Sequence, residues 1–361
     1  MAQQPDNQRA GPPAAPALDE PRLRRYLPAA LVDDLLRSYD DPDASPDRLV
    51  EAFVHLACAR ATIATYLPRM LSGQLLERRS PGPWLRWVEG SLLFADLSGS
   101  TALAERLSTL GREGTELVTA FLNQIFTTLI QVIQEYGGDL VAFGGDALLV
   151  FFGDDRHPRT AARAALALQE AMRGYVQVVP GVGSFPMHLH IGVESGRVAF
   201  VSAGGERERH YGVLGATVNR VAAAEGYARP NEVVAGPGAW ATLAGFAQGQ
   251  QVAPGFYRVG AIRAPARPHP PLPEEPAITA APQLAIPRLL DELDRVSPYI
   301  PADLLRRILA EPQLPQIEAD LRPVSALFAQ VVGLEALAEA LPEDEGRRTK
   351  DERPKLLDRI S

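Results

Sequence analysis

The chain has 361 residues, of which 46% are hydrophobic and 22% are charged, and its formal net charge is −8. This length and apolar content can fill at least one large core, which excludes a wholly disordered or collagen-like protein. The negative charge offers no basic surface for nucleic acid. No long apolar run and no secretion signal occur, so we expect a cytoplasmic protein without a membrane span.

The N-terminal part divides into two segments. Residues 1–21 are rich in proline and alanine without periodicity, which predicts a disordered leader. Residues 22–85 are expected to form a helical N-terminal segment. Its clearest helix lies at 45–66, where Ser45 is a cap and a proline follows at the first helical position. The single cysteine, Cys58, lies in this helix and is expected to be buried and without a chemical role.

Residues 86–262 alternate strand-like and helix-like patterns, which predicts a mixed domain of helices and strands. The expected elements are, in chain order, a strand at 91–97, a long helix with a wide apolar stripe at 117–133, a strand pair at 137–153, a helix at 160–172 and a hairpin at 187–201. The apolar stripe must be buried. The core is therefore expected to be a largely antiparallel sheet covered by helices.

A linker and an internal repeat follow. Residues 263–287 contain eight prolines, a density that excludes a regular helix, so we predict a linker there. The string "YLPRML" begins at Tyr66, 28 residues before Phe94, and "YIPADL" begins at Tyr299, 29 residues before Phe328. This nearly equal spacing indicates that one kind of domain begins twice.

The second copy is incomplete. Residues 93–107 and 327–341 agree at nine of 15 aligned positions. Only 20 residues follow Leu341, which are too few to complete the second copy. We therefore predict that residues 288–361 are the start of a second, degenerate and truncated domain.

Two aspartates could hold metal ions. Asp96 ends an apolar strand and precedes a helix, whose free N-terminal amides suit a phosphate group. Asp146 lies in the turn of the predicted strand pair, where preceding glycines allow close backbone approach. Two carboxylates at one sheet edge can hold two magnesium ions about 4 Å apart for displacement at phosphorus. The simpler alternatives are an ordinary helix cap and a plain hairpin turn.

Four strings resemble the class III adenylate and guanylate cyclases: "LLFADLSGSTALAERL", "GGDLVAFGGDALLVFFG", "HIGVESGRV" and "HYGVLGATVNRVAA", within about residues 88–240. The resemblance implies an α+β fold, a ferredoxin-like (βαββαβ) palm over residues 86–262, which dimerises head to tail. It also implies conversion of ATP or GTP to a 3′,5′-cyclic nucleotide and pyrophosphate in intracellular signalling, by two-metal-ion catalysis at a domain interface.

The same resemblance implies roles for single residues. Asp96 and Asp146 match the family's metal-binding aspartates, for two Mg²⁺ or Mn²⁺ ions, and Leu97 matches a residue whose backbone carbonyl contacts metal. Asn219 matches the asparagine that orients the ribose. His190 falls where many members carry an arginine, and a structural role is the alternative for it. The residues expected to bind nucleotide are Leu97, Ser98, Gly99, Ser100, Thr101, Gly145 and His190.

Three positions depart from the family. Ala142 replaces a base-selecting lysine, Gly212 replaces a base-selecting aspartate or threonine, and Ala223 replaces the transition-state arginine. A symmetric dimer of this domain should therefore be nearly inert. In the second copy Gln330 replaces the metal aspartate. The pattern resembles a tandem, soluble cyclase in which this chain supplies the metal-binding half and needs a complementary cyclase domain in cis or in trans.

Alternatives remain. The chain could be a catalytically weak nucleotide-binding regulatory pseudo-cyclase, or a natural short form that borrows a partner from another chain. A diguanylate cyclase is disfavoured, because Asp146 is followed by Ala147 and Leu148 instead of that family's acidic and aromatic pair. The choice between ATP and GTP stays open, because the base-reading positions would lie in the other half.

Overall fold

The structure is a computed structural model that describes residues 19–39, 47–77, 82–263 and 282–313, together with Ser325 and Gly333. The chain divides into two compact units. The first, here called the helical unit, combines residues up to Tyr66 with residues 75–79 and 274–317. The second, here called the α/β unit, contains residues 67–74, 80–273 and 318–361. Each unit is described by itself.

The helical unit joins two stretches that are far apart in the sequence. Its elements are α1 (Glu20–Tyr26), α2 (Ala29–Tyr39), α3 (Asp47–Thr65), α10 (Pro282–Val296), a 3₁₀ turn (Ser297–Tyr299) and α11 (Ala302–Ala310). Arg60 on α3 and Glu292 on α10 form an ion pair of 3.0 Å in which both side chains are largely buried. The Tyr26 hydroxyl donates to Asp294 at 2.6 Å, and burial raises the pKa of Tyr26. Cys58 on α3 is half-buried, not buried as predicted.

Helix α10 begins at Pro282, inside the residues predicted to be linker. It tolerates Pro287 because its apolar face, including Leu289 and Leu293, is buried in the unit. Helices α10 and α11 contain most of the described residues that were expected to begin the second domain, and they fold with the N-terminal helices. The repeat at 327–341, including Gln330, lies outside the described residues apart from Gly333.

Each Tyr–X–Pro string is the junction of two helices. Tyr66-Leu67-Pro68 joins α3 to α4 (Arg69–Glu77), and Tyr299-Ile300-Pro301 joins the α10 segment to α11. A third copy, Tyr26-Leu27-Pro28, joins α1 to α2 and was missed in the sequence. Leu27 is extended, as the residue before a proline should be, and the proline then starts the next helix.

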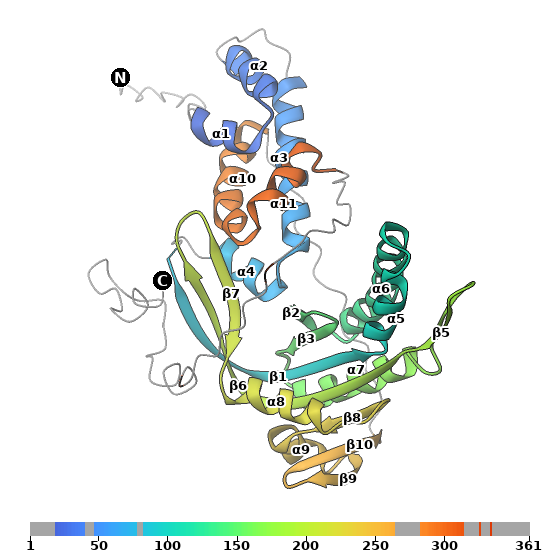
Figure 1. The fold of residues 1–361 in the computed structure, drawn as a ribbon. Helices are drawn as coiled ribbons and strands as arrows, with labels where there is room; N and C mark the ends of the chain where they lie inside the picture. The colour runs from blue at the N-terminus through green and yellow to red at the C-terminus, as the bar shows by residue number, and fades with distance from the viewer. Residues whose placement is uncertain are drawn as a thin grey trace, which may run out of the picture. The chain divides into compact units, whose positions relative to one another are not determined.

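The α/β unit begins with the predicted βαββαβ order. Its first elements are β1 (Trp84–Ser98), α5 (Ser100–Ser108), α6 (Arg112–Glu135), β2 (Asp139–Gly144), β3 (Ala147–Phe152), α7 (His157–Ala171) and β6 (His188–Gly204). The sheet order β2-β3-β1-β6, with antiparallel neighbours, is that of a ferredoxin-like palm. The long strands β1 and β6 run side by side through the middle of the unit (Figure 1). The predicted α+β fold is confirmed.

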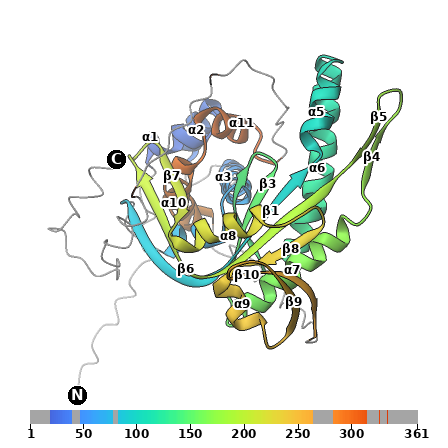
Figure 2. The same ribbon diagram turned by 60° about the horizontal axis from the view of Figure 1, so that its bottom comes forward.

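Further elements extend this sheet. They are β7 (Arg209–Leu214), α8 (Ala216–Gly226), β8 (Glu232–Ala235), α9 (Pro237–Leu243), β9 (Ala247–Ala253) and β10 (Phe256–Ile262). Strand β8 pairs in parallel with β6, and β10 and β9 continue the sheet. The separate β4–β5 hairpin (Val176–Val179 and Gly183–Pro186) extends away from the main sheet (Figure 2).

Alternation along β1 separates two faces of the sheet. Leu93, Ala95 and Leu97 are buried with residues of α5, α6 and α7 in the main core. Because successive side chains of a strand point to opposite faces, Asp96 lies on the other face. Helix α8 lies on that second face, where a methyl group at Gly192 would come within 2.4 Å of the Val221 carbonyl oxygen. The predicted site therefore faces away from the helix-covered core.

Two sequence expectations are wrong in detail. Residues 187–201 are not a hairpin, because β6 is one strand that pairs with β1 through Gly196, which lies opposite Gly90. The apolar stripe of α6 is only partly buried: Ile125 and Leu129 are in the core, whereas Phe126 is half-buried and packs against it. The glycine at 196 resembles a turn locally, but the long pairing with β1 keeps β6 continuous.

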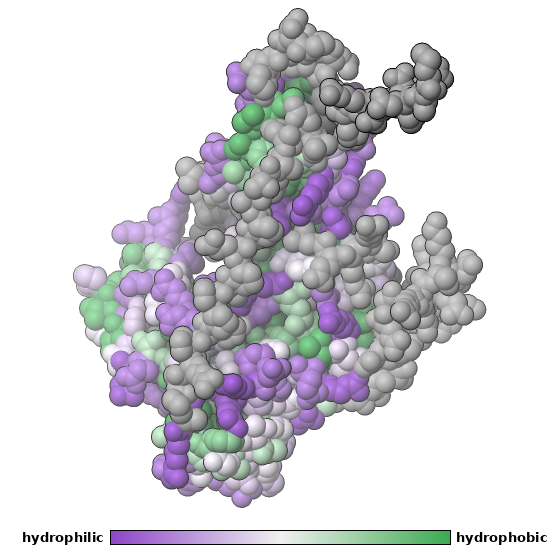
Figure 3. All heavy atoms as spheres, turned by 180° about the vertical axis from the view of Figure 1, so that it is seen from behind, coloured by the Kyte–Doolittle hydropathy of each residue, from purple (hydrophilic) through white to green (hydrophobic). Residues whose placement is uncertain are grey.

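Within the described residues, α6 has the length and apolar composition of a membrane-crossing helix. This is weak evidence, because core helices of water-soluble proteins pass the same test. From behind, the described surface shows polar residues among small apolar patches (Figure 3).

Glu194 is a buried carboxylate that holds α9 against β6. It is fully buried, and its Oε1 accepts hydrogen bonds from the backbone amides of Ser195 at 2.7 Å and Ala239 at 3.1 Å. We expect Glu194→Ala to lower the free energy of unfolding by about 2–4 kcal/mol, because the buried amides lose their acceptor. Urea denaturation measures this loss, and a variant as stable as the wild type would contradict it.

Candidate active site

The backbone brings Asp96 and Asp146 together at one edge of the sheet. Asp96 on β1 lies between Ala147 on β3 and His190 on β6 in the strand register. Asp146 directly precedes Ala147, in the turn between β2 and β3. Gly145 in this turn has φ +71°, a conformation that favours glycine. Two strands and one turn thus place both carboxyl groups close together at this edge of the sheet.

The segment after β1 completes this edge. Ser100 is buried, and its hydroxyl contacts Asp146 Oδ2 and the carbonyl of Leu97. Gly99 has φ +99°, and a methyl group there would lie 2.4 Å from the Pro186 carbonyl oxygen. Helix α5 then begins at Ser100 without a side-chain cap on its first amides. The turn therefore joins the Asp146 hairpin to a helix N-terminus, the kind of end that suits an anion.

The remaining residues of this turn have different environments. The Ser98 hydroxyl donates to the His188 carbonyl at 3.3 Å, while Thr101 is exposed at the first turn of α5. The Leu97 side chain is buried, which leaves its backbone carbonyl as the group that could reach a ligand. The predicted set from 97 to 101 is therefore brought beside the two aspartates.

The charges at the edge favour a cation. Burial and the nearby Asp146 raise the pKa of Asp96, whereas His190 lowers it. A cation between two carboxylates would relieve their repulsion. Carboxylate and carbonyl oxygens are the donors that Mg²⁺ and Mn²⁺ prefer, so the residues present fit such an ion. No cluster of three histidine, cysteine or acidic side chains suited to a metal occurs among the described residues, so the fit rests on Asp96, Asp146 and the Leu97 carbonyl.

His190 lies beside Asp96 but already has a structural partner. Its Nδ1 is 3.0 Å from the Ala228 carbonyl, which can only accept, so Nδ1 donates. Glu225 on α8 is a residue that sequence reasoning missed. Burial and the charge of Asp96 raise the pKa of Glu225. Only the fold reveals this third carboxylate, because nothing in the sequence links position 225 to position 96.

Asn219 does not join the aspartate pair within one chain. It is exposed on α8, six residues before Glu225. Six helical residues span about 9 Å along the axis, so Asn219 lies more than a helical turn beyond the end of α8 that approaches Asp96. Ala142 and Ala223 are also exposed, and Gly212 lies on β7 opposite Val201. Ala142 is in the same hairpin as Asp146, whereas Gly212 and Ala223 are on β7 and α8.

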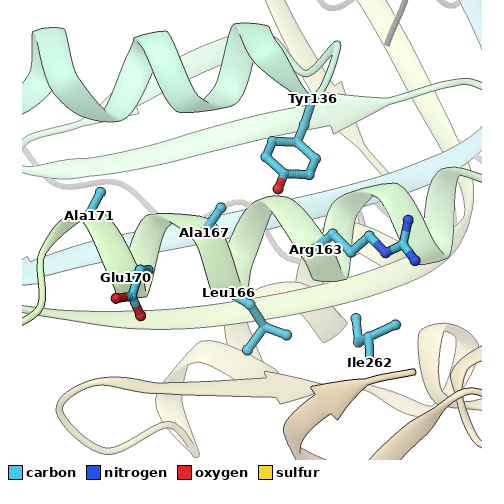
Figure 4. A pocket seen from close by; sticks show the side chains of 7 residues that line it. All are labelled: Tyr136, Arg163, Leu166, Ala167, Glu170, Ala171 and Ile262. Carbon is cyan, nitrogen blue, oxygen red and sulfur yellow. The ribbon is translucent and has the colours of Figure 1, made fainter. Parts of the chain in front are cut away.

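Two hollows lie elsewhere in the α/β unit. One of about 620 Å³ is lined by Tyr136, Arg163, Leu166, Ala167, Glu170, Ala171 and Ile262 (Figure 4). The other, of about 610 Å³, includes His157 and Ser195. Behind this hollow, Ser91 Oγ is 2.8 Å from His157 Nδ1. Ser91 is fully buried and does not line the hollow. Neither hollow contains a residue of the predicted site.

Metal binding at the aspartate edge should depend on pH. Because the pKa of Asp96 is raised above its ordinary value of 3.8, protons compete with a metal at higher pH than at an ordinary aspartate. Mn²⁺ affinity is therefore expected to be full above the raised pKa and to fall as the pH is lowered through it. Calorimetric titration with Mn²⁺ between about pH 4 and 7 measures this. An affinity that is constant over this range would show that Asp96 is not a ligand.

This part of the chain is similar in sequence to known proteins. Residues 87–253 match the family model for the adenylate and guanylate cyclase catalytic domain. Adenylate cyclase type 10 of Oryctolagus cuniculus is 28% identical over 182 residues, which are 49% of this chain and 11% of that protein. Adenylate cyclase 1 of Rhizobium meliloti is 27% identical over 170 residues, 46% of this chain and 25% of that protein.

Among solved structures, the guanylyl cyclase Cya2 is 26% identical, with a TM-score of 0.42 and coverage of 52% of this chain and 98% of that one. The chain spans only 11% of the length of the mammalian relatives that it matches. The sequence match, the ferredoxin-like strand order and the paired aspartates agree with one another. Residues 87–253 of this chain are therefore a catalytic domain of the class III adenylate and guanylate cyclase family.

Proposed function

We propose that the α/β unit is the metal-binding half of a nucleotidyl cyclase that converts ATP to a 3′,5′-cyclic nucleotide and pyrophosphate. The observation that carries this proposal is the proximity of Asp96 and Asp146 at one edge of a cyclase palm. ATP is preferred over GTP because the two relatives described above are named adenylate cyclases.

In this proposal Asp96, Asp146 and the Leu97 carbonyl hold Mg²⁺ or Mn²⁺. The bound ions supply positive charge that lowers the pKa of the ribose 3′-hydroxyl and neutralises the triphosphate. The first turn of α5, from Gly99 to Thr101, holds phosphate oxygens with its uncapped amides. The ribose 3′-hydroxyl would give its proton to solvent water as its oxygen bonds to the α-phosphorus. The bond between the α-phosphorus and the bridging oxygen of the β-phosphate would break, and pyrophosphate would leave with the electron pair.

The proposal includes a complementary cyclase domain. Asn219 lies apart from the aspartate edge, so a single copy does not assemble the whole predicted site. The positions for base selection and for transition-state charge hold Ala142, Gly212 and Ala223, none of which offers a polar side chain. A head-to-tail partner, in cis or in trans, would bring its own asparagine, lysine and arginine to the Asp96 edge.

A regulatory pseudo-cyclase is the second candidate. It is favoured by the same three non-polar positions, because a domain that only binds nucleotide and metal needs neither a base-selecting lysine nor a transition-state arginine. In that case the chain would bind ATP with Mn²⁺ and would turn over none, even beside a complementary domain.

Cyclic nucleotide production from ATP and from GTP with Mn²⁺ tests the proposal. The 361-residue chain is compared with the same chain mixed with, or extended by, a complete second cyclase domain. Activity in the completed form only, and its loss on Asp96→Ala, is the expected result. If both forms bind ATP with Mn²⁺ but produce no cyclic nucleotide, the result would favour the regulatory pseudo-cyclase. Full activity of the 361-residue chain by itself would refute the need for a partner.

A further inference from the structure

Asp139 makes contacts that the proposed chemistry does not use. It is the first residue of β2 and follows Gly137 and Gly138. Its side chain is only 13% exposed, and burial raises the pKa of its carboxyl group. Because a buried carboxylate needs hydrogen-bond donors, the partners of Asp139 define its role.

Both carboxylate oxygens cap helix α4. The backbone amide of Arg69 donates to Oδ1 at 2.8 Å, and that of Met70 donates to Oδ2 at 2.8 Å. The Arg69 side chain adds an ion pair, with Nε 3.7 Å from Oδ1, and a hydrogen bond to the Gly138 carbonyl. Helix α4 follows the Tyr66-Leu67-Pro68 junction, and its residues up to Gln74 belong to the α/β unit. Asp139 therefore fixes the entry helix from a distant part of the sequence.

The same strand leads to the proposed metal site. Strand β2 ends at Gly144, two residues before Asp146. It is the edge of the sheet, where it pairs with β3, and its register shifts between Leu140 and Ala142. An edge strand has a neighbour on one side only, so a contact that fixes its first residue restrains the path of the whole hairpin.

The turn before β2 is rigidly packed. A methyl group at Gly138 would lie 2.8 Å from atoms of Ile133, Val150 and Phe152. The turn cannot shift toward the core without displacing these side chains. The turn therefore leaves Asp139 little freedom to move toward the core when α4 moves.

We propose that Asp139 is a positioning residue that couples helix α4 to the metal-binding hairpin at Asp146. This inference rests on the proposed function, because that function assigns metal binding to the hairpin. Coupling between two sites is reciprocal: if the capped α4 favours metal binding, the metal must strengthen the cap. If the cap only stabilised the fold, metal binding would not change the strength of its hydrogen bonds.

Hydrogen exchange of the full chain with and without Mn²⁺ measures this reciprocity. In the wild-type protein, Mn²⁺ should slow amide exchange at residues 143–147, beside the ion. It should also slow exchange at Arg69 and Met70 by about fivefold, the lower end of usual coupling between sites. This comparison needs no variant, so it does not depend on a substituted protein being folded.

Asp139→Asn adds a second test. Its amide group presents N–H to one of the two backbone amides and loses one acceptor. We expect Mn²⁺ affinity to fall about fivefold or more, and the Mn²⁺ effect at Arg69 and Met70 to disappear. Asp154→Asn is the matched control, because Asp154 also accepts from a helix-start amide, Arg156 N at 2.6 Å, but on α7 and away from the hairpin. It should leave both measurements unchanged.

The outcomes separate the two proposals. Protection of 143–147 by Mn²⁺ without any change at α4 would overturn the coupling and leave the proposed function intact. Unchanged Mn²⁺ affinity in Asp139→Asn would also overturn it. Absence of any Mn²⁺ effect at 143–147 would overturn the proposed metal site, and the coupling with it.

Discussion

Asp96→Asn is expected to abolish Mn²⁺ binding at the sheet edge and to lower cyclase activity strongly in the completed form. The amide is neutral and gives one weak oxygen donor in place of a carboxylate, so the ion loses a charged ligand. Loss of metal-assisted charge stabilisation should lower kcat by about a hundredfold to a thousandfold. Calorimetry with Mn²⁺ and the cyclase assay measure the two losses.

The same variant should be slightly more stable than the wild type without metal. The folded-state pKa of Asp96 is raised, so its contribution to stability is present below the ordinary value of 3.8 and is lost as the pH rises through the raised pKa. At neutral pH the ionised Asp96 is therefore destabilising, by roughly 1 kcal/mol, because water still screens part of this half-buried carboxylate. Mn²⁺ should reverse the order by stabilising only the wild type. A metal-free variant less stable than the wild type would contradict this account.

The largest gain in cyclase activity should come from restoring the family's polar residues at three positions together. Ala142→Lys, Gly212→Asp and Ala223→Arg return the polar groups that the family resemblance implies for base selection and transition-state charge. We expect the cyclase activity of the 361-residue chain with Mn²⁺ to rise at least about a hundredfold, because each half of a symmetric dimer would then carry a complete set. Ala142 and Ala223 are exposed, so the longer side chains have room.

The control for this gain is the triple variant with Asp96→Ala, which should be inactive. Activity that survives in this control would come from a contaminant or from a site other than the aspartate edge. A folded triple variant that dimerises and binds Mn²⁺ but stays inert would show that this domain lacks more than three side chains, which would favour the regulatory pseudo-cyclase.

Much of the α/β unit could be predicted because its signals are local. The apolar run before Asp96 predicted the middle of β1, and period-two alternation already separates Asp96 from the core residues Ala95 and Leu97. The glycines around 137 and 145 predicted the β2–β3 strand pair. Each of these signals depends on neighbours within a few residues, which a sequence displays directly.

Other features depend on partners that a sequence does not display. The glycine at 196 resembles a turn, yet 15 residues of β1 pair along β6 and keep the strand continuous. Glu225 approaches Asp96 only because α8 packs on Gly192. The cap from Asp139 to α4 spans 70 residues of sequence. These contacts are products of tertiary packing, so residue patterns alone could not reveal them.

The pairing of α3 with α10 has a consequence for the order of folding. The ion pair between Arg60 and Glu292 joins residues 232 positions apart, and residues 67–74 and 80–273 of the α/β unit lie between them. During synthesis from the N-terminus, α1 to α3 must wait for α10, whereas all strands of the sheet are already available. The α/β unit is thus an insertion that can fold first, and closure of the helical unit is the late, slow step because its contacts are the most distant in sequence.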